Sequence, residues 1–281
     1  MAEVNTYLDI KDLNKSIGDL ILFENASLSI AERQRIGIIG RNGTGKSTLL
    51  NIISGKEGYD SGEVVFRRGI KVGFLEQSPE YIPDQTVIEA CFNNGNEKAE
   101  LIYKYMECIS ANDHSRLSEL SNSMDISDAW NYEHRIKEVL SKLNISNFHE
   151  RMGNLSGGQR KRVALANVLL TEPDMLILDE PTNHLDLQMI EWLEKYLSQQ
   201  YITLLMVTHD RYFLDRVCNK IIELDNHQFY PYQGSYSYFI EKRQQRKDAE
   251  AAEVARANNL YRRELEWMRR MPQARGHKAK Y

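Results

Sequence analysis

A glycine-rich loop between an apolar strand and a helix constrains this chain more than any other feature. The loop is Gly40-Arg41-Asn42-Gly43-Thr44-Gly45-Lys46-Ser47, after the apolar run at 35–39 and before a helical pattern at 48–53. In this context backbone N–H groups and the positive end of the helix form an anion site, and the glycines let a phosphate chain approach closely. We expect Lys46 to reach the β- and γ-phosphates and the Ser47 hydroxyl to ligate Mg2+. The expected nucleotide contacts are Gly40, Asn42, Gly43, Gly45, Lys46, Ser47 and Thr48.

Polar side chains at three further strand ends suit phosphoryl transfer. The apolar run at 175–178 ends in two carboxylates, of which we expect Asp179 to hold Mg2+ and Glu180 to act as general base toward water. His209 ends the apolar run at 202–207 and is expected to contact the γ-phosphate. Gln77 is expected to sense the metal and the attacking water. The predicted catalytic set is Glu180, His209, Gln77 and Lys46, and the predicted metal set is Ser47, Gln77 and Asp179.

A second anion-binding helix start follows at Leu155-Ser156-Gly157-Gly158-Gln159. Ser156 is a favourable N-cap residue, and the glycines expose backbone donors at the positive end of the helix. One phosphate chain does not need two such helix ends from one domain. We therefore expect Ser156, Gly157, Gly158 and Gln159 to serve a nucleotide held by another domain.

The order of predicted strands and helices indicates an α/β fold. Strand and helix patterns alternate around the motifs, which predicts a mostly parallel core sheet with helices on its faces. Residues 4–39 predict a β-rich subdomain, and 62–77 predict a hairpin with Gly69 at its turn. Over 78–154, charged residues are interspersed with apolar residues at helical spacing. This pattern predicts a helical subdomain within a domain at 1–240. Its aromatic residues suit either the core or a partner surface: Tyr103, Tyr105, Trp130 and Tyr132.

Residues 241–281 form a basic, helical extension. They carry 12 Lys and Arg against 6 Asp and Glu, so the net charge of +6 there contrasts with −10 elsewhere. Charged helices are commonly just solvated. However, Arg262-Arg263 and Arg269-Arg270 alternate with Tyr261 and Trp267, a combination that suits nucleic acid. Phosphate binding does not distinguish RNA from DNA, so the charge and the aromatic residues alone leave both open as partners, beside a helix that is simply solvated.

Bulk features exclude several classes of protein. No apolar run approaches the roughly 20 residues that a membrane helix needs, and no signal peptide is visible. Cys91, Cys108 and Cys218 lack metal-ligand spacing, so free thiols in a cytoplasmic protein are expected.

The six motifs together resemble an ATP-binding cassette over residues 5–230. In order they match Walker A, the Q-loop at Gln77, the LSGGQ signature, Walker B, the D-loop His184-Leu185-Asp186 and the H-switch at His209. This resemblance implies a P-loop NTPase fold, ATP and Mg2+ as ligands, and ATP hydrolysis. It also implies a head-to-tail pair of cassettes, in which one P-loop and the other Ser156 motif close over each ATP. Asp186 is expected at that shared nucleotide interface.

Three segments resemble the ABC-F branch: 181–186, 209–214 and 232–238. Transporter cassettes more often carry Ser-Ala-Leu-Asp at the D-loop. ABC-F resemblance implies no membrane domain and action on the ribosome, which makes RNA the expected partner of the basic extension, with DNA possible. It also implies that 1–240 is the N-terminal cassette and 241–281 the start of a truncated linker to a second cassette, which a second copy could replace. Residues 269–275 look most like Uup-type members.

One position departs from the family pattern, and other functions remain open. The position that usually carries an adenine-stacking aromatic residue holds Ile17, with Phe23 nearby, so selectivity for the base is in doubt. The alternatives are a Uup-like role on DNA, the nucleotide-binding subunit of a transporter, and a clamp whose hydrolysis is negligible.

Overall fold

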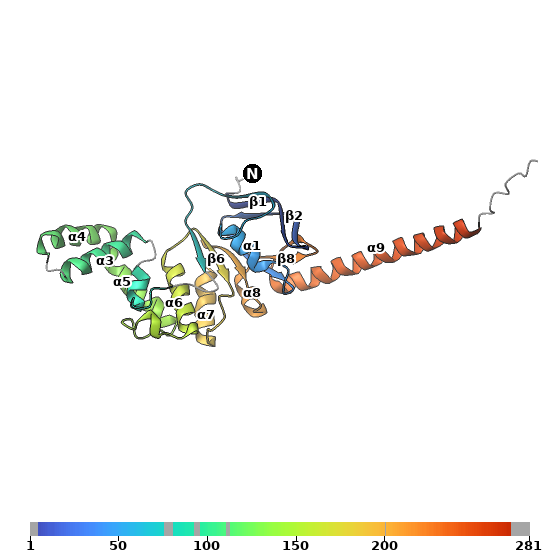
Figure 1. Cartoon of the computed structure of the whole chain (residues 1–281). Coiled ribbons are helices and arrows are strands. Elements are labelled where there is room, and N and C mark those ends of the chain that lie inside the picture. Colours follow the sequence, from blue (N-terminus) through green and yellow to red (C-terminus); the bar gives the residue numbers. More distant parts are fainter. Residues whose placement is uncertain (1–4, 76–80, 93–95, 111–112, 200, 271–281) are drawn as a thin grey trace, which may run out of the picture. The chain divides into compact units, whose positions relative to one another are not determined.

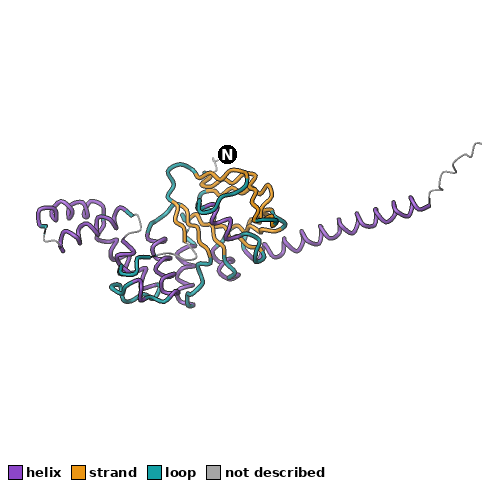
Figure 2. The backbone as a smooth tube through the Cα atoms, viewed as in Figure 1, coloured by secondary structure: helices purple, strands orange, loops and turns teal. Residues whose placement is uncertain are grey.

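The computed structural model describes residues 5–75, 81–92, 96–110, 113–199 and 201–270. The chain divides into two compact units, Met1–Tyr236 and Ser237–Tyr281. Figure 1 traces the elements along the chain, and Figure 2 shows strands and helices in the first unit. Gln77 and residues 271–281, on which parts of the sequence prediction rest, lie outside the described residues.

The larger sheet has six strands in the order β5-β6-β7-β3-β8-β9. The first five are parallel, and β9 runs antiparallel to β8. β6 and β7 are buried throughout, as expected for near-continuous apolar runs in a parallel sheet covered on both faces. The α/β prediction with a mostly parallel core sheet is therefore confirmed. The bounds are β3 (Arg35–Gly40), β5 (Val72–Leu75), β6 (Met175–Asp179), β7 (Thr203–Val207), β8 (Lys220–Asp225) and β9 (Gln228–Gln233).

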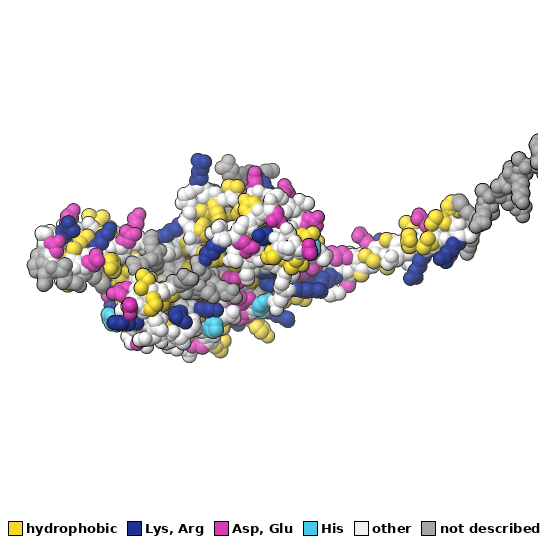
Figure 3. Space-filling model, viewed as in Figure 1, with side chains coloured by type: hydrophobic (Ala, Val, Ile, Leu, Met, Phe, Trp, Pro, Cys, Tyr) yellow, Lys and Arg dark blue, Asp and Glu magenta, His cyan; other side chains and the backbone are white. Residues whose placement is uncertain are grey.

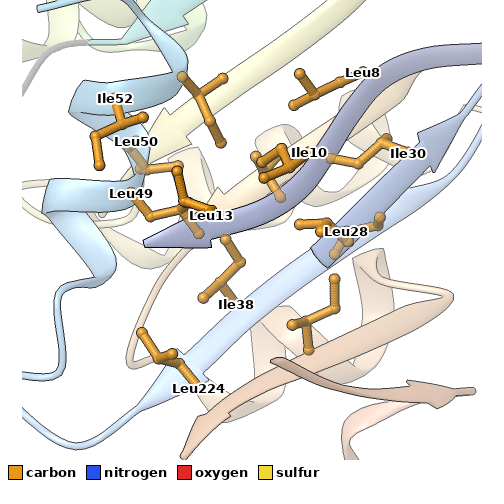
Figure 4. Packing of buried hydrophobic residues seen from close by; sticks show 14 of the residues in the cluster. Leu8, Ile10, Leu13, Leu28, Ile30, Ile38, Leu49, Leu50, Ile52 and Leu224 are labelled. Atoms are coloured by element: carbon orange, nitrogen blue, oxygen red, sulfur yellow. The ribbon is translucent and has the colours of Figure 1, made fainter. Parts of the chain in front are cut away.

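The smaller sheet is antiparallel, with the order β2-β1-β4. Its strands are β1 (Thr6–Ile17), β2 (Leu20–Ala31) and β4 (Ser61–Phe66). Side chains from both sheets and from α1 (Lys46–Ile53) form one apolar cluster, in which Leu13, Ile38 and Leu49 are fully buried. Figure 4 shows residues of β1, β2, β3 and α1 packed there. This cluster fixes the β1–β2 hairpin against the P-loop.

The predicted hairpin at 62–77 is wrong. Gly69 does lie in a turn, with φ +82°, but the two strands that it separates belong to different sheets. β4 pairs antiparallel with β1, whereas β5 pairs parallel with β6, from Val72 opposite Met175 to Leu75 opposite Leu178. β6 begins about a hundred residues after β5 in the sequence. β5 therefore pairs with a buried strand that is distant in sequence, and not with β4, which directly precedes it.

Seven further helices lie among the described residues of the first unit. The predicted helical region contains α2 (Val87–Phe92), α3 (Glu97–Ser110), α4 (His114–Ser127) and α5 (Ala129–Lys142), and the short 3-10 turn η1 (Met152–Asn154) follows. Tyr132 and Asn96 both donate hydrogen bonds to the Leu170 carbonyl, which ties this region to the end of α6. Of its aromatic residues, Tyr132 is buried, and Tyr105 packs edge-on against the half-exposed Trp130. The other helices are α6 (Gly157–Leu170), α7 (Leu187–Leu197) and α8 (Arg211–Val217).

The described part of the second unit lies in one helix, α9 (Tyr236–Arg270), of 35 residues. Basic, acidic and apolar side chains all appear along it (Figure 3). Tyr261 and Trp267 are 62% and 61% exposed, so neither is packed in a core. Among the described helices, none combines the length and the apolar character that crossing a membrane requires.

Candidate nucleotide site

The glycine-rich loop has a conformation that its glycines make possible. Gly45 precedes α1 with φ +95°, and Gly43 has φ +81°, a region that favours glycine. A Cβ on Gly45 would also lie 3.0 Å from Cζ of Phe23. A Cβ on Gly40 would lie 2.9 Å from the Leu224 carbonyl oxygen. These glycines hold the loop backbone open at the start of α1.

Lys46 lies against the loop that precedes it. Its Nζ atom donates hydrogen bonds to the carbonyl oxygens of Gly40, at 3.0 Å, and Arg41, at 2.9 Å. The side chain is buried. Burial lowers the pKa of Lys46, and the nearby carboxylates of Glu180 and Asp179 partly oppose this effect. The ammonium group is thus held within the loop that would surround a phosphate chain.

Asp179 is a buried carboxylate at the end of β6. Burial raises the pKa of Asp179, against the opposing effects of a hydrogen bond from the Ser47 hydroxyl and of the charges on Lys46 and Lys161. A hydroxyl and a carboxylate side by side are hard oxygen donors, and Mg2+ is commonly held by one or two such groups together with substrate phosphates and water. Ser47 and Asp179 therefore fit a magnesium ion.

Glu180 and His209 face each other across the ends of β6 and β7. Nε2 of His209 lies 3.6 Å from Oε1 of Glu180, and the His209 backbone N–H donates to Oε2 at 3.4 Å. The Glu180 backbone N–H donates to the Val207 carbonyl at 2.8 Å, and its φ is +49°. The side chain of Glu180 is 18% exposed and that of His209 is 64% exposed. An acid is thereby aimed into the same space as an accessible imidazole.

These groups border one cavity of about 530 Å3. It brings together most of the predicted loop residues with Asp179, Glu180 and His209. Sequence reasoning missed four of its lining residues, Leu20, Leu22, Asn183 and Val207. Leu20 was detectable as the residue facing Ile17 across a tight turn at Gly18, but the other three depend on tertiary packing. The lining residues are Ile17, Leu20, Leu22, Asn42, Gly43, Gly45, Lys46, Ser47, Thr48, Asp179, Glu180, Asn183, Val207 and His209.

The Ser156 motif does not contribute to this cavity. Ser156 caps α6 through a reciprocal pair: its hydroxyl accepts from the Gln159 N–H at 3.2 Å, and Gln159 Oε1 accepts from the Ser156 N–H at 2.9 Å. Ser156 and Gly157 are exposed, and a Cβ on Gly157 would meet no atom within 4 Å. The motif therefore presents an accessible helix start on another part of the surface.

Asp186 also stands apart from the residues that line the cavity. Its side chain caps α7 by accepting a hydrogen bond from the Met189 N–H at 3.0 Å. The predicted role of Asp186 at a shared nucleotide interface would add to this local role in starting the helix.

Comparison with known proteins gives the family. A model described as ABC transporter matches residues 23–183, and a related extension model matches residues 222–281. The dimeric post-hydrolysis structure of the ATP-binding cassette MJ0796 with ADP and Pi is similar, with a TM-score of 0.60 and 25% identity over 80% of this chain and 98% of that chain. The ATP-binding subunit of an ABC transporter shares the fold, with a TM-score of 0.62 and 20% identity over 81% and 90% of the two chains.

Two curated relatives narrow the family. The uncharacterized ABC transporter ATP-binding protein YfmR of Bacillus subtilis (strain 168) is 42% identical, over 97% of this chain and 45% of the relative. The energy-dependent translational throttle protein EttA of Mycobacterium tuberculosis (strain ATCC 25618 / H37Rv) is 36% identical, over 96% of this chain and 50% of the relative. The chain thus spans about half the length of these relatives. It belongs to the ATP-binding cassette family and is a cassette of the ABC-F type.

Proposed function

We propose that this chain is an Mg-ATP-dependent ATPase cassette that provides half of each of two composite sites. The observation that carries the proposal is the convergence of Lys46, Ser47, Asp179, Glu180 and His209 on one cavity, while the Ser156 motif opens elsewhere. A phosphate chain in the loop would have a helix start, an ammonium group and an oxygen-donor pair on one side. The opposite side would come from the Ser156 motif of a second cassette.

The side chains suggest how hydrolysis would proceed. Lys46 would exchange the carbonyls of Gly40 and Arg41 for phosphate oxygens, because its amine already lies inside the loop. Glu180 would orient the attacking water and accept its proton, and His209 would stabilise the γ-phosphate from the neighbouring strand end. Mg2+, held by Ser47 and Asp179, would neutralise charge on the β- and γ-phosphates. The role expected of Gln77, which lies outside the described residues, stays a prediction.

The test is the dependence of turnover on protein concentration. If each site needs a second cassette, hydrolysis per chain by this polypeptide is low and rises with concentration as copies pair. Lys46→Ala serves as the control for loss of phosphate binding. Glu180→Gln should bind ATP and pair but not turn it over. Strong turnover that is independent of concentration in a monomer contradicts the composite site.

We further propose that the protein acts on the ribosome. The support is the relative whose name describes a translational throttle, together with the Arg pairs and exposed aromatic residues on α9. Arg side chains and exposed rings suit an RNA backbone and unstacked bases. A partner that is RNA also explains why this extension has a net positive charge while the rest of the chain has a net negative charge.

Co-sedimentation with ribosomes tests this part of the proposal, using a full-length protein with both cassettes locked by Glu180→Gln and its counterpart. Arg262→Gln with Arg263→Gln should reduce the bound fraction and lower its sensitivity to salt. Glu250→Gln with Glu253→Gln, on the same helix, is the matched control and should not reduce binding. Competition between branched DNA and structured RNA for the protein, at equal salt concentration, distinguishes a role on DNA from a role on RNA. Equal binding by both double variants would refute the role of these arginines.

A further inference from the structure

The walls of the cavity differ in chemistry. The glycine-rich loop and the ends of β6 and β7 contribute its hydroxyl, amine, amide, carboxylate and imidazole groups. The β1–β2 hairpin contributes three residues, and all three are aliphatic: Ile17, Leu20 and Leu22. If the loop holds the phosphates, the hairpin wall is the apolar surface left for the base.

The hairpin presents two of these side chains to solvent. Ile17 pairs with Leu20 across a tight turn, where Gly18 has φ +59°. Ile17 is 54% exposed and Leu20 is 56% exposed, although both are large aliphatic residues beside a polar cavity. Leu22, by contrast, is buried, and a Cβ on Gly45 would lie 3.3 Å from its Cβ. The hairpin therefore forms a small aliphatic platform next to the P-loop.

Phe23 does not supply the aromatic surface that Ile17 lacks. It is 1% exposed, and its ring packs against Phe229 with centroids 5.7 Å apart. Its Cζ atom lies under Gly45, on the core side of the loop. The ring is therefore part of the apolar cluster and not available for stacking on a base.

An aliphatic platform has little capacity to distinguish one base from another. A site that hydrogen-bonds a substrate group rejects analogues lacking it by factors of about 10⁴ to 10⁵, whereas an apolar pocket discriminates far less. Bases differ mainly in the donors and acceptors on their edges. Among the described residues that line the hairpin wall, Ile17, Leu20 and Leu22 offer no side-chain donor or acceptor to read those edges.

We propose that this site accepts nucleoside triphosphates with little regard to the base, because it holds them by the triphosphate and only covers the base with Ile17 and Leu20. This inference rests on the proposed nucleotide-binding function and specifies its substrate class. ATP, GTP, CTP and UTP, each with Mg2+, are expected to bind this chain with dissociation constants within a factor of ten. The remaining differences reflect the area of the base that contacts the two side chains.

Displacement of radiolabelled ATP by each unlabelled triphosphate, with the intact 281-residue chain, measures those constants. A spread below tenfold supports the inference, and a spread of tenfold or more overturns it. Failure of every triphosphate to bind contradicts the proposed function as well. A base preference in a chain that binds ATP well contradicts only the inference, so the two failures are distinguishable.

A substitution tests the role of the platform directly. Ile17→Tyr adds a ring where the base is expected, and stacking on an aromatic ring should tighten binding of all four triphosphates by about fivefold or more. Ile21→Tyr is the matched control: it lies on the same hairpin, is 46% exposed and is not among the cavity-lining residues. It should leave the four constants unchanged. Unaltered affinities for all four triphosphates in Ile17→Tyr would show that the hairpin does not contact the base.

Discussion

Replacing Ser156 separates two roles of this side chain. It caps α6 within its own chain, and we propose that it also contacts the phosphates bound at the P-loop of a second cassette. Ser156→Ala removes the acceptor for the Gln159 N–H and breaks the reciprocal cap of α6. Loss of a Ser cap costs about 0.5 to 2 kcal/mol. Because this helix start is exposed, water can replace part of the lost hydrogen bond, so we expect the free energy of unfolding to fall by about 1 kcal/mol. For a chain of this size that corresponds to a melting temperature about 2 to 4 °C lower.

Ser156→Asp provides the contrasting variant. Aspartate is an equally favoured N-cap residue, and its charge suits the positive end of a helix. Its thermal stability should therefore stay within about 0.5 kcal/mol of the native chain. The added negative charge would nevertheless repel the phosphates that a partner cassette brings to α6. We expect turnover in the paired protein to fall at least tenfold with Ser156→Asp, and less with Ser156→Ala.

Differential scanning fluorimetry, ATP titration and concentration-dependent turnover together test this reasoning. Both variants should bind ATP at their own P-loop like the native chain, since Ser156 does not line that cavity. Native turnover in Ser156→Asp would refute the shared site. Weakened ATP binding to a single chain would instead place Ser156 in its own nucleotide pocket.

Three further outcomes are expected. Gly37→Ala places a Cβ 2.4 Å from Cδ2 of the buried Leu214, so it should destabilise the chain by about 1 to 3 kcal/mol in chemical denaturation, whereas Gly58→Ala, with open space around it, should be neutral. Burial raises the folded-state pKa of Asp179, so the folded chain loses stability as the pH rises through that pKa and the carboxyl group ionises. The Asp179→Asn variant should therefore have a higher melting temperature than the native chain at pH 7, and this difference should disappear in acid. The variant should not hydrolyse ATP. An alkylating probe should label the partly exposed Cys108 first, because burial raises the pKa to about 12 at both Cys91 and Cys218. Equal melting of Asp179→Asn and native chain at pH 7, or labelling of the buried thiols in the folded chain, would contradict these expectations.

Local chemistry made much of the fold and site predictable. The P-loop, the two apolar runs that become β6 and β7, and the Ser156 cap each combine residues whose conformational preferences agree with the final structure. The ends of parallel strands meet at one sheet edge, so Asp179 and His209 were expected together once both runs were recognised. Proximity of these groups therefore follows from short-range patterns and one topological rule.

Pairing partners and cavity walls were not predictable in the same way. Alternating residues in β4 and β5 identify strands, but they do not say that Val72 aligns with Met175 and not with its neighbour in sequence. Leu22 and Asn183 become cavity walls because separate elements converge. No motif marks Leu22, and the segment that contains Asn183 resembles ABC-F proteins without indicating that this side chain lines the cavity. The positive φ of Glu180 is likewise a property of the assembled strand ends.

That backbone conformation at Glu180 has a consequence for how the chain can vary. A non-glycine residue with a left-handed backbone costs about 1 kcal/mol or more, and here the Val207 carbonyl fixes it in place. Glycine at 180 would relieve this cost and should make a more stable but inactive protein. The carboxylate at 180 thus lowers the stability of the folded chain. A screen that selects variants only for thermal stability is therefore expected to replace Glu180.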